Sequence, residues 1–259
     1  MRYFGAPEKN RIMNRFFVGK ENILDDEIII SDREDIHHIT KVLRLKEGAL
    51  CDISDSGEWE YRVRLVSFAG GEIRAKILDK QKFSSEPELM IALFQGVPKQ
   101  GKMESIIQKS VELGVYCIVP VFMARTITVH NESFAKKIGR WQKVAAEAVK
   151  QCRRGIIPKV ENEVTFSGMI NLFDSERFDK ILFAYENEKG RTIKDALRDI
   201  KEKPRSLAIA IGPEGGFSDE EAKSLEIAGG VSVSLGKTVL RTETAGPAAI
   251  AMAMYELEL

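Results

Sequence analysis

The sequence predicts an α/β protein with two parts, a small β-barrel followed by a parallel sheet covered by helices. Two observations indicate this. The first third consists of short strand-like runs separated by glycine turns. Beyond residue 84 the apolar runs become continuous and alternate with helices, which is typical of strands buried on both faces. The polar stretch Lys82–Pro87 lies between them and resembles a linker. We therefore predict domains at residues 1–84 and 85–259.

Five short strands are expected in the first part. Alternation is clearest in Glu60–Phe68, where Tyr61 and Val63 alternate with Arg62 and Arg64. The glycine turns 55–57 and 69–71 bound this strand. The other expected strands are Phe16–Val18, Glu27–Ser31, Ala49–Ser54 and Glu72–Lys80.

The second part carries buried-type strands and well-marked helices. Apolar residues recur at helical spacing through Glu132–Arg154, while most lysines and arginines fall off that stripe. Ser218 and Glu221 form a capping box for a helix that ends at Gly229 and Gly230. The last helix is expected to begin near Gly246 and Pro247. The expected strands are Leu89–Phe94, Val115–Val121, Lys180–Ala184, Leu207–Ile211 and Val231–Leu235.

Composition narrows the class of protein. The 259 residues are 44% hydrophobic and 30% charged, as expected of a globular protein that buries a sizeable core. No apolar run is long enough to cross a bilayer, and the N-terminus lacks a signal peptide's apolar stretch. The three cysteines are far apart, so neither a disulfide framework nor a metal site is expected. A cytoplasmic protein without a membrane partner is the simplest expectation.

Charge is unevenly distributed along a chain whose formal net charge is zero. Residues 95–155 contain 11 basic and 4 acidic residues, and residues 1–20 contain 5 basic residues and one acidic residue. Residues 156–259 contain 13 basic and 18 acidic residues. The two basic regions fit a protein that presents a face to a polyanion, although solvated helix faces give the same pattern.

Three polar or glycine-rich loops follow buried strands. They are 184–188, 211–218 (IGPEGGFS) and 235–245 (LGKTVLRTETA). Loops at the carboxyl ends of parallel strands meet at one edge of a sheet, so we expect them to form one pocket. The glycine loop matches neither a dinucleotide nor a P-loop motif, and a tight turn alone could require its glycines.

At GPEGGFSDEE and LGKTVLRTETA the sequence closely resembles the RsmE family, the 16S rRNA uridine N3 methyltransferases of the SPOUT superfamily. Further similarity lies in NRFFV (14–18), HITKVLR (38–44), PKQGKMESIIQKSVELGV (98–115) and EAVKQCRRGIIP (147–158). The resemblance covers about Met13 to the C-terminus. The sequence differs from the family pattern in two places. One is Ala124-Arg125-Thr126, where the family often has an acidic residue before the arginine, and the other is the extra residues that precede Met13.

The resemblance implies a SPOUT domain with a C-terminal trefoil knot, preceded by a PUA-like β-barrel that helps to hold RNA. It also implies a homodimer that forms N3-methyluridine at the position usually numbered 1498 of 16S rRNA in the small ribosomal subunit. S-adenosylmethionine would bind in the knot loops. The residues it implies there are Leu182, Phe183, Ala184, Glu186, Ile211, Gly212, Pro213, Glu214, Gly215, Gly216, Leu235, Gly236, Val239, Leu240, Arg241 and Thr242.

Methylation of a uracil N3 requires loss of its proton, and the resulting anion needs stabilisation. We hypothesise that Arg241 stabilises the anion or orients the uracil, and that Glu243 or Glu214 holds the arginine or accepts the proton. Structural ion pairs would explain either glutamate equally well. The expected RNA contacts are Arg11, Arg15, His38, Lys41, Arg44, Lys99, Lys102, Arg125, Arg140, Lys143, Lys150, Arg153 and Arg154.

Two other functions remain open from the sequence. One is a non-catalytic RNA-binding factor in ribosome assembly, which would bind S-adenosylmethionine weakly or not at all. The other is a SPOUT methyltransferase that acts on another RNA or on a ribose hydroxyl. The intact glycine loop argues against the first, and the barrel domain argues against the second by resemblance.

Overall fold

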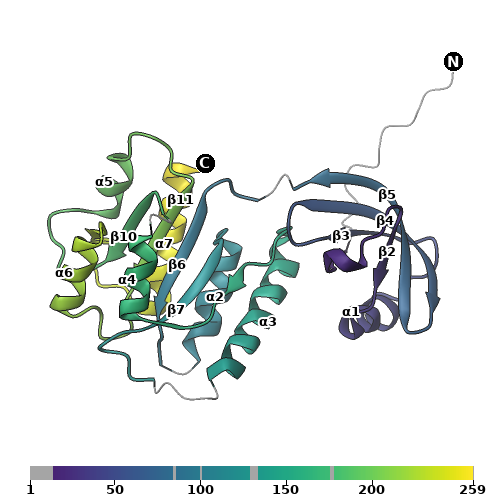
Figure 1. The fold of residues 1–259 in the computed structure, drawn as a ribbon, viewed down its shortest axis with the longest axis horizontal. Coiled ribbons are helices and arrows are strands. Elements are labelled where there is room, and N and C mark those ends of the chain that lie inside the picture. Colours follow the sequence, from purple (N-terminus) through teal and green to yellow (C-terminus); the bar gives the residue numbers. More distant parts are fainter. Residues whose placement is uncertain (1–13, 84–85, 100, 129–133, 176–177, 259) are drawn as a thin grey trace. The chain divides into compact units, whose positions relative to one another are not determined.

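The computed structural model describes residues 14–83, 86–99, 101–128, 134–175 and 178–258 (Figure 1). The chain divides into two compact units, Met1–Ser85 with Arg153–Ile156, and Glu86–Cys152 with Ile157–Leu259. Each unit has its own sheet and its own core.

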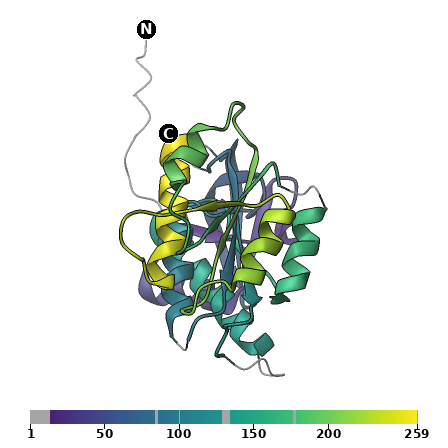
Figure 2. The same ribbon diagram turned by 90° about the vertical axis from the view of Figure 1, so that its left-hand side faces the viewer.

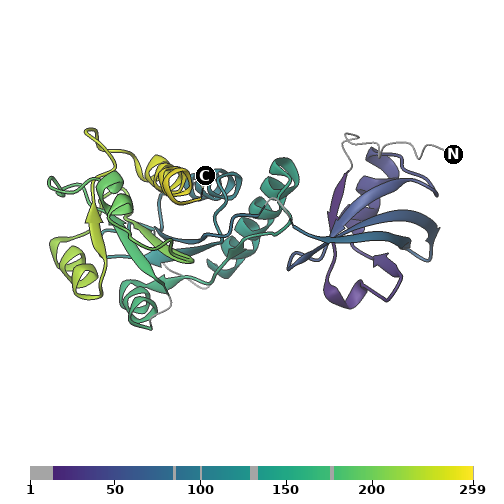
Figure 3. The same cartoon turned by 90° about the horizontal axis from the view of Figure 1, so that it is seen from above.

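The first unit is built on a curved five-stranded sheet of order β1-β3-β4-β5-β2 (Figure 3). Its strands are β1 (Arg15–Phe17), β2 (Glu27–Ile30), β3 (Leu50–Ser54), β4 (Trp59–Ala69) and β5 (Glu72–Lys82). All pairs are antiparallel except β1 with β3. One face of the alternating strands packs inward and forms a closed apolar core that includes Phe16, Ile30 and Val63.

A helical segment closes the core of this unit. Helix α1 (Arg33–His37) is capped by Asp32, whose side chain accepts the N–H of Asp35 at 2.9 Å. It continues into a π-helical turn over His38–Val42, in which Ile39 is fully buried. This helix could not be predicted from the sequence, because two short turns contain too few residues for a helical period.

The second unit is built on a sheet in which every strand pair is parallel, of order β12-β10-β11-β6-β7-β8, with β9 also paired to β7. Both faces are covered, so the central strands are apolar throughout. The strands are β6 (Met90–Gly96), β7 (Cys117–Phe122), β8 (Lys159–Val160), β9 (Val164–Thr165), β10 (Lys180–Ala184), β11 (Ser206–Ile211) and β12 (Val231–Val233).

Helices cover both faces of this sheet (Figure 2). Helices α2 (Lys102–Glu112), α5 (Ile193–Arg198) and α7 (Thr242–Leu257) lie on one side, and α4 (Phe166–Asp174) and α6 (Asp219–Ile227) lie on the other. Helix α3 (Phe134–Cys152) packs against α2. The core under α4 and α6 contains edge-to-face aromatic pairs, including Phe94 with Phe173 and Phe183 with Phe217.

The expected start of the last helix is wrong. Helix α7 begins at Thr242, four residues before Gly246, and Pro247 lies inside it. Proline cannot donate to the carbonyl of Glu243, so it removes one helical hydrogen bond near the N-terminus. The buried packing of Ala245, Gly246 and Ala249 keeps the helix continuous through this point. The first turn of α7 therefore includes residues that the sequence placed in a loop.

Candidate active site

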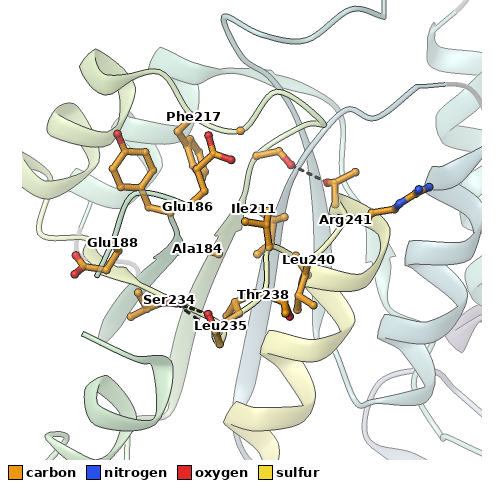
Figure 4. A pocket seen from close by; sticks show the side chains of 18 of the residues that line it. Ala184, Glu186, Glu188, Ile211, Phe217, Ser234, Leu235, Thr238, Leu240 and Arg241 are labelled. Atoms are coloured by element: carbon orange, nitrogen blue, oxygen red, sulfur yellow. Dashed lines mark hydrogen bonds between the residues drawn. The ribbon is translucent and has the colours of Figure 1, made fainter. Parts of the chain in front are cut away.

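Three neighbouring parallel strands end at one edge of the second sheet. Ala184 of β10 pairs with Ile211 of β11 on one side and with Val233 of β12 on the other. The loops that follow the three strands surround a cavity of about 760 Å³ (Figure 4). The structure thus brings together the three loops that were expected to form one pocket.

Close backbone packing explains the glycines of the loop after β11. Gly216 has φ +66°, a left-handed conformation that side chains disfavour. A Cβ added to Gly212 would lie 2.8 Å from the carbonyl carbon of Gly216. The Gly216 N–H donates to the Pro213 carbonyl at 2.9 Å, which closes the turn. The loop therefore needs glycine at both positions to present its backbone to the cavity.

Side chains from two other elements fix the start of this loop. Thr242 Oγ1 donates to the Gly212 carbonyl at 2.7 Å, and Gln95 Nε2 donates to Thr242 Oγ1 at 2.9 Å. Gln95 is fully buried at the end of β6. The cavity floor is thus joined to β6 and to the first turn of α7 by buried polar contacts.

The far end of the loop is held by the segment after β7. Arg125 donates to the Gly215 carbonyl at 2.7 Å, and the Ala124 N–H donates to Glu221 at 2.8 Å. Glu221 also completes the predicted capping box with Ser218. Arg125 thus holds the Gly215 carbonyl in this chain, although the preceding position is Ala124 and not the acidic residue that the family often has there.

The loop after β10 forms another wall of the cavity. Tyr185 donates to Asp219 at 2.6 Å, and this hydrogen bond raises the pKa of the phenol. Glu188 accepts the Ser232 hydroxyl and the Gly190 N–H, each at 2.6 Å. These bonds lower the pKa of Glu188 despite its partial burial. Glu186 is exposed, and its carboxylate faces Gly216.

An ion cluster lies at the other end of the cavity. Lys102 Nζ is 3.0 Å from Glu214 Oε1 and 3.1 Å from Glu243 Oε2. The two carboxylates raise the pKa of Lys102. Burial opposes ionisation of Glu214, but hydrogen bonds from Lys102 and backbone N–H groups hold its pKa below the usual value. The pKa of Glu243 is lowered by its own backbone N–H and by Lys102, which outweigh its burial.

Arg241 immediately precedes α7 and lines the same cavity. Its side chain is exposed and extends away from the other labelled residues in Figure 4. Its charge contributes to the lowered pKa of Glu243. A cation is therefore available beside the cavity, close enough to Glu243 to act on its carboxylate.

Most residues expected to bind a cofactor line the cavity. Three do not: Leu182 and Phe183 are buried within β10, and Gly215 packs against Arg125. The lining residues among the expected ones are Ala184, Glu186, Ile211, Gly212, Pro213, Glu214, Gly216, Leu235, Gly236, Val239, Leu240, Arg241 and Thr242. Tyr185, Lys237 and Thr238 also line the cavity and lie within the segments expected to bind the cofactor. Further lining residues lie outside those segments: Glu188, Lys189, Arg191, Thr192, Phe217, Val233, Ser234 and Ala245.

The basic residues expected to contact RNA in the second unit differ in their surroundings. Lys99 and Lys143 are exposed, and Arg140 is exposed but pairs with Glu104 at 2.5 Å. Lys150 is partly buried and lies 3.5 Å from Glu147. Lys102 lies in the ion cluster at the cavity.

In the first unit, Lys41 and Arg44 are exposed, and His38 packs edge-to-face on Phe16. Arg15 pairs with Glu60 and donates to the Arg153 carbonyl. Arg154 is 7% exposed, so its side chain is not a surface contact in this structure. Arg11 lies outside the described residues.

The segment Arg153–Ile156 has a structural role in the first unit. Ser54 Oγ donates to the Gly155 carbonyl at 2.5 Å. A Cβ on Gly155 would clash with the Phe83 ring at 2.1 Å. Packing within the first unit therefore accounts for the glycine of the CRRG sequence (152–155). Among the helices that the structure describes, none is long and apolar enough to span a bilayer.

Comparison with known proteins gives a consistent result. A family model described as an RNA methyltransferase domain matches residues 85–254, and one described as an RNA methyltransferase PUA domain matches residues 30–67. Ribosomal RNA small subunit methyltransferase E of Bacillus subtilis is 31% identical over 95% of this chain and 98% of its own length.

Two solved structures share the whole fold. The methyltransferase E of Neisseria gonorrhoeae, bound to S-adenosylmethionine, has a TM-score of 0.82 at 30% identity and covers 94% of this chain and 97% of its own. A putative methyltransferase of Legionella pneumophila, also with the cofactor bound, has a TM-score of 0.80 at 28% identity over the same shares. The PUA-like barrel, the SPOUT-like α/β domain and the relatives together show that this chain belongs to the RsmE family of ribosomal RNA small subunit methyltransferases.

Proposed function

We propose that this protein transfers the methyl group of S-adenosylmethionine to N3 of a uridine in 16S rRNA of the small ribosomal subunit, at the position usually numbered 1498. The observation that carries this proposal is the cavity at the carboxyl edge of the parallel sheet. Its glycine loop, its acidic wall and the neighbouring Arg241 supply the parts that the reaction needs.

The residues of the cavity fit S-adenosylmethionine. A volume of about 760 Å³ is suited to a ligand of that size. Ile211, Val233 and Leu235 offer apolar surface, and the loop backbones offer hydrogen-bonding groups. Glu186 supplies a carboxylate for a positively charged ligand. When bound, the cofactor supplies the electrophilic methyl group.

Arg241 is proposed to contact the target uracil and to stabilise its anion. Deprotonated uracil spreads its negative charge over two carbonyl oxygens, and a guanidinium beside the ring stabilises that charge. The side chain extends away from the other labelled cavity residues in Figure 4, so it can reach a base beside the cavity. Glu243 and Glu214 are held as carboxylates, in the form that a proton acceptor requires.

RNA is expected to bind mainly through phosphate contacts, with the target uridine turned out of its stack. Lys41, Arg44, Lys99 and Arg140 have exposed side chains suited to this role. Each contact adds to the salt dependence of binding rather than to sequence specificity.

The active form is proposed to be a homodimer, and the cavity loops are proposed to belong to a trefoil knot. Exposed apolar side chains on α7 support the first proposal, since Tyr255 is 73% exposed and Met252 37%. The return of the chain from β12 into α7, past the loop after β11, is the segment in which a knot would form. Sedimentation analysis checks the dimer directly.

A methyl-transfer assay tests the function. The protein is incubated with methyl-labelled S-adenosylmethionine and one of three substrates: free 16S rRNA, assembled small subunits or large subunits. Label is expected in 16S rRNA and not in large subunits. Cofactor binding without any transfer would instead favour the assembly factor.

A further inference from the structure

Lys102 occupies an unusual position for a basic residue at a nucleic-acid site. It is the first residue of α2, directly after Gly101, which has φ +88°. Its ammonium group lies between two carboxylates that come from different elements, Glu214 from the loop after β11 and Glu243 from the first turn of α7. One side chain thus joins three segments of the candidate site.

Further contacts strengthen this junction. Glu214 also accepts the backbone N–H of Lys99, at 3.0 Å from Oε1 and 3.3 Å from Oε2. Glu243 lies two residues after Arg241 and one after Thr242, whose hydroxyl fixes Gly212. A movement of Lys102 would therefore affect the glycine loop at Glu214 and the start of the helix beside Arg241.

We propose that Lys102 is a positioning residue for methyl transfer, which fixes the Glu214 and Glu243 carboxylates beside the cavity and so places Arg241 against the acceptor base. The inference rests on the proposed function and adds which residue holds the groups of that active site in position. It assigns Lys102 to this role in place of the phosphate contact expected from the sequence.

The surroundings of the ammonium group favour this role over a phosphate contact. The Lys102 side chain is 29% exposed, and both carboxylates lie within 3.1 Å of its nitrogen. A phosphate that approached it would be repelled by Glu214 and Glu243 and would have to displace one of them. Lys99 differs, because its side chain is exposed and only its backbone serves the cluster.

A dependence on pH follows from the geometry. Among the residues that the structure describes, the titratable groups that contact Lys102 are Glu214 and Glu243, and the charge of Arg241 acts on Glu243. Lys102 lowers the pKa of both carboxyls, so without it both pKa values rise and protonation begins at higher pH. The acidic fall in kcat should therefore move to higher pH when the ammonium group is removed.

The experiment compares Lys102→Met with Lys109→Met, a matched change at an exposed lysine of the same helix. Three quantities are measured: the pH profile of kcat, the affinity for 16S rRNA as a function of salt without cofactor, and the affinity for S-adenosylmethionine. For Lys102→Met we expect kcat to fall ~10²-fold, because displacement of the reacting groups by about 1 Å is enough to lower the rate by that factor. The acidic limb should move to higher pH, and the salt dependence of RNA binding should stay unchanged. Lys109→Met should leave the pH profile unchanged.

Lys102→Arg restores the charge and should recover part of kcat and the original acidic limb. If Lys102→Met does not fold, this arginine variant and Lys102→Gln provide the same comparison. A reduced salt dependence of RNA binding with an unaltered pH profile would overturn the inference and identify a phosphate contact. Wild-type protein that transfers no methyl group to any RNA would instead refute the proposed function.

Discussion

The strands of the two units differ in how many of their faces are buried. In the first, each strand places one side in the core and the other in solvent, so Arg62 and Arg64 of β4 are exposed between buried neighbours. In the second, both faces of the central strands are buried, and β11 has five consecutive buried residues. Polar chemistry in the second unit is therefore confined to the ends of its strands, where three loops meet.

The difference predicts where single substitutions are costly. A parallel sheet brings its loops to one edge, so each loop residue there has several close neighbours. A basic surface on a small barrel spreads its contacts over many side chains, each of which contributes little. Substitutions at the cavity should therefore have large and specific effects, and those on the barrel surface small and additive ones.

The largest effect is expected for Arg241→Ala. Loss of the group that stabilises the uracil anion should lower kcat about 10²–10³-fold, as for other donors to a developing negative charge. The affinity for S-adenosylmethionine should change little, because the side chain extends away from the other labelled cavity residues in Figure 4. Single-turnover kinetics and calorimetry separate the two quantities. A normal kcat in a folded protein would remove Arg241 from the mechanism.

Gly216→Val should reduce the affinity for S-adenosylmethionine by about 10²-fold. Valine disfavours φ +66°, and its side chain would point at Glu186 across the cavity. Gly229→Val is the matched control, since Gly229 has φ +84° with no neighbour within 4 Å of an added Cβ. Both variants should lose similar stability, but only Gly216→Val should lose cofactor affinity. Equal affinities would mean that this loop does not bind the cofactor.

Thr242→Val should destabilise the protein by about 1–3 kcal/mol, because it removes the hydroxyl that donates to the Gly212 carbonyl and leaves the buried Gln95 amide with the Gly96 carbonyl as its remaining acceptor. Thr244→Val, at an exposed position one residue beyond Glu243, should cost much less. Urea unfolding gives both values. A free-energy difference near zero between the two variants would show that the loop is held by other contacts.

The smallest effects are expected on the barrel. Lys41→Ala and Arg44→Ala should each weaken RNA binding a few-fold and reduce the slope of log K against log salt by about 0.7–0.9. Neither should change cofactor affinity. Filter binding at several salt concentrations measures the slope. A large loss from either substitution alone would contradict the spread-out contacts that we expect of this surface.

Much of the fold could be predicted from local patterns. The alternation of β4 and the apolar stripe of α3 are properties of neighbouring residues, and α3 appears at Phe134–Cys152, inside the expected range. The start of α7 at Thr242 could not be predicted in this way, because Gly246 and Pro247 locally favour a helix that begins there. Their burial against the sheet and α2 overrides that preference.

The candidate site was predictable in outline but not in its ion pairs. Three loops after three parallel strands must meet, so their convergence follows from topology. Nothing local indicates that Lys102 pairs with Glu214 and Glu243, which lie more than 100 residues away. Arg15 was likewise expected to contact RNA, yet it pairs with Glu60, and that pairing depends on the order β1-β3-β4 in the sheet.

The identity of the methylated nucleoside tests the central claim most directly. After reaction with small subunits, one portion of the 16S rRNA is digested and its nucleosides are identified by mass spectrometry. In a second, intact portion the modified position is located by reverse transcription, which an N3 methyl group blocks. We predict N3-methyluridine at a single uridine near the 3′ end. A methyl group on a ribose hydroxyl or on another base would contradict the account.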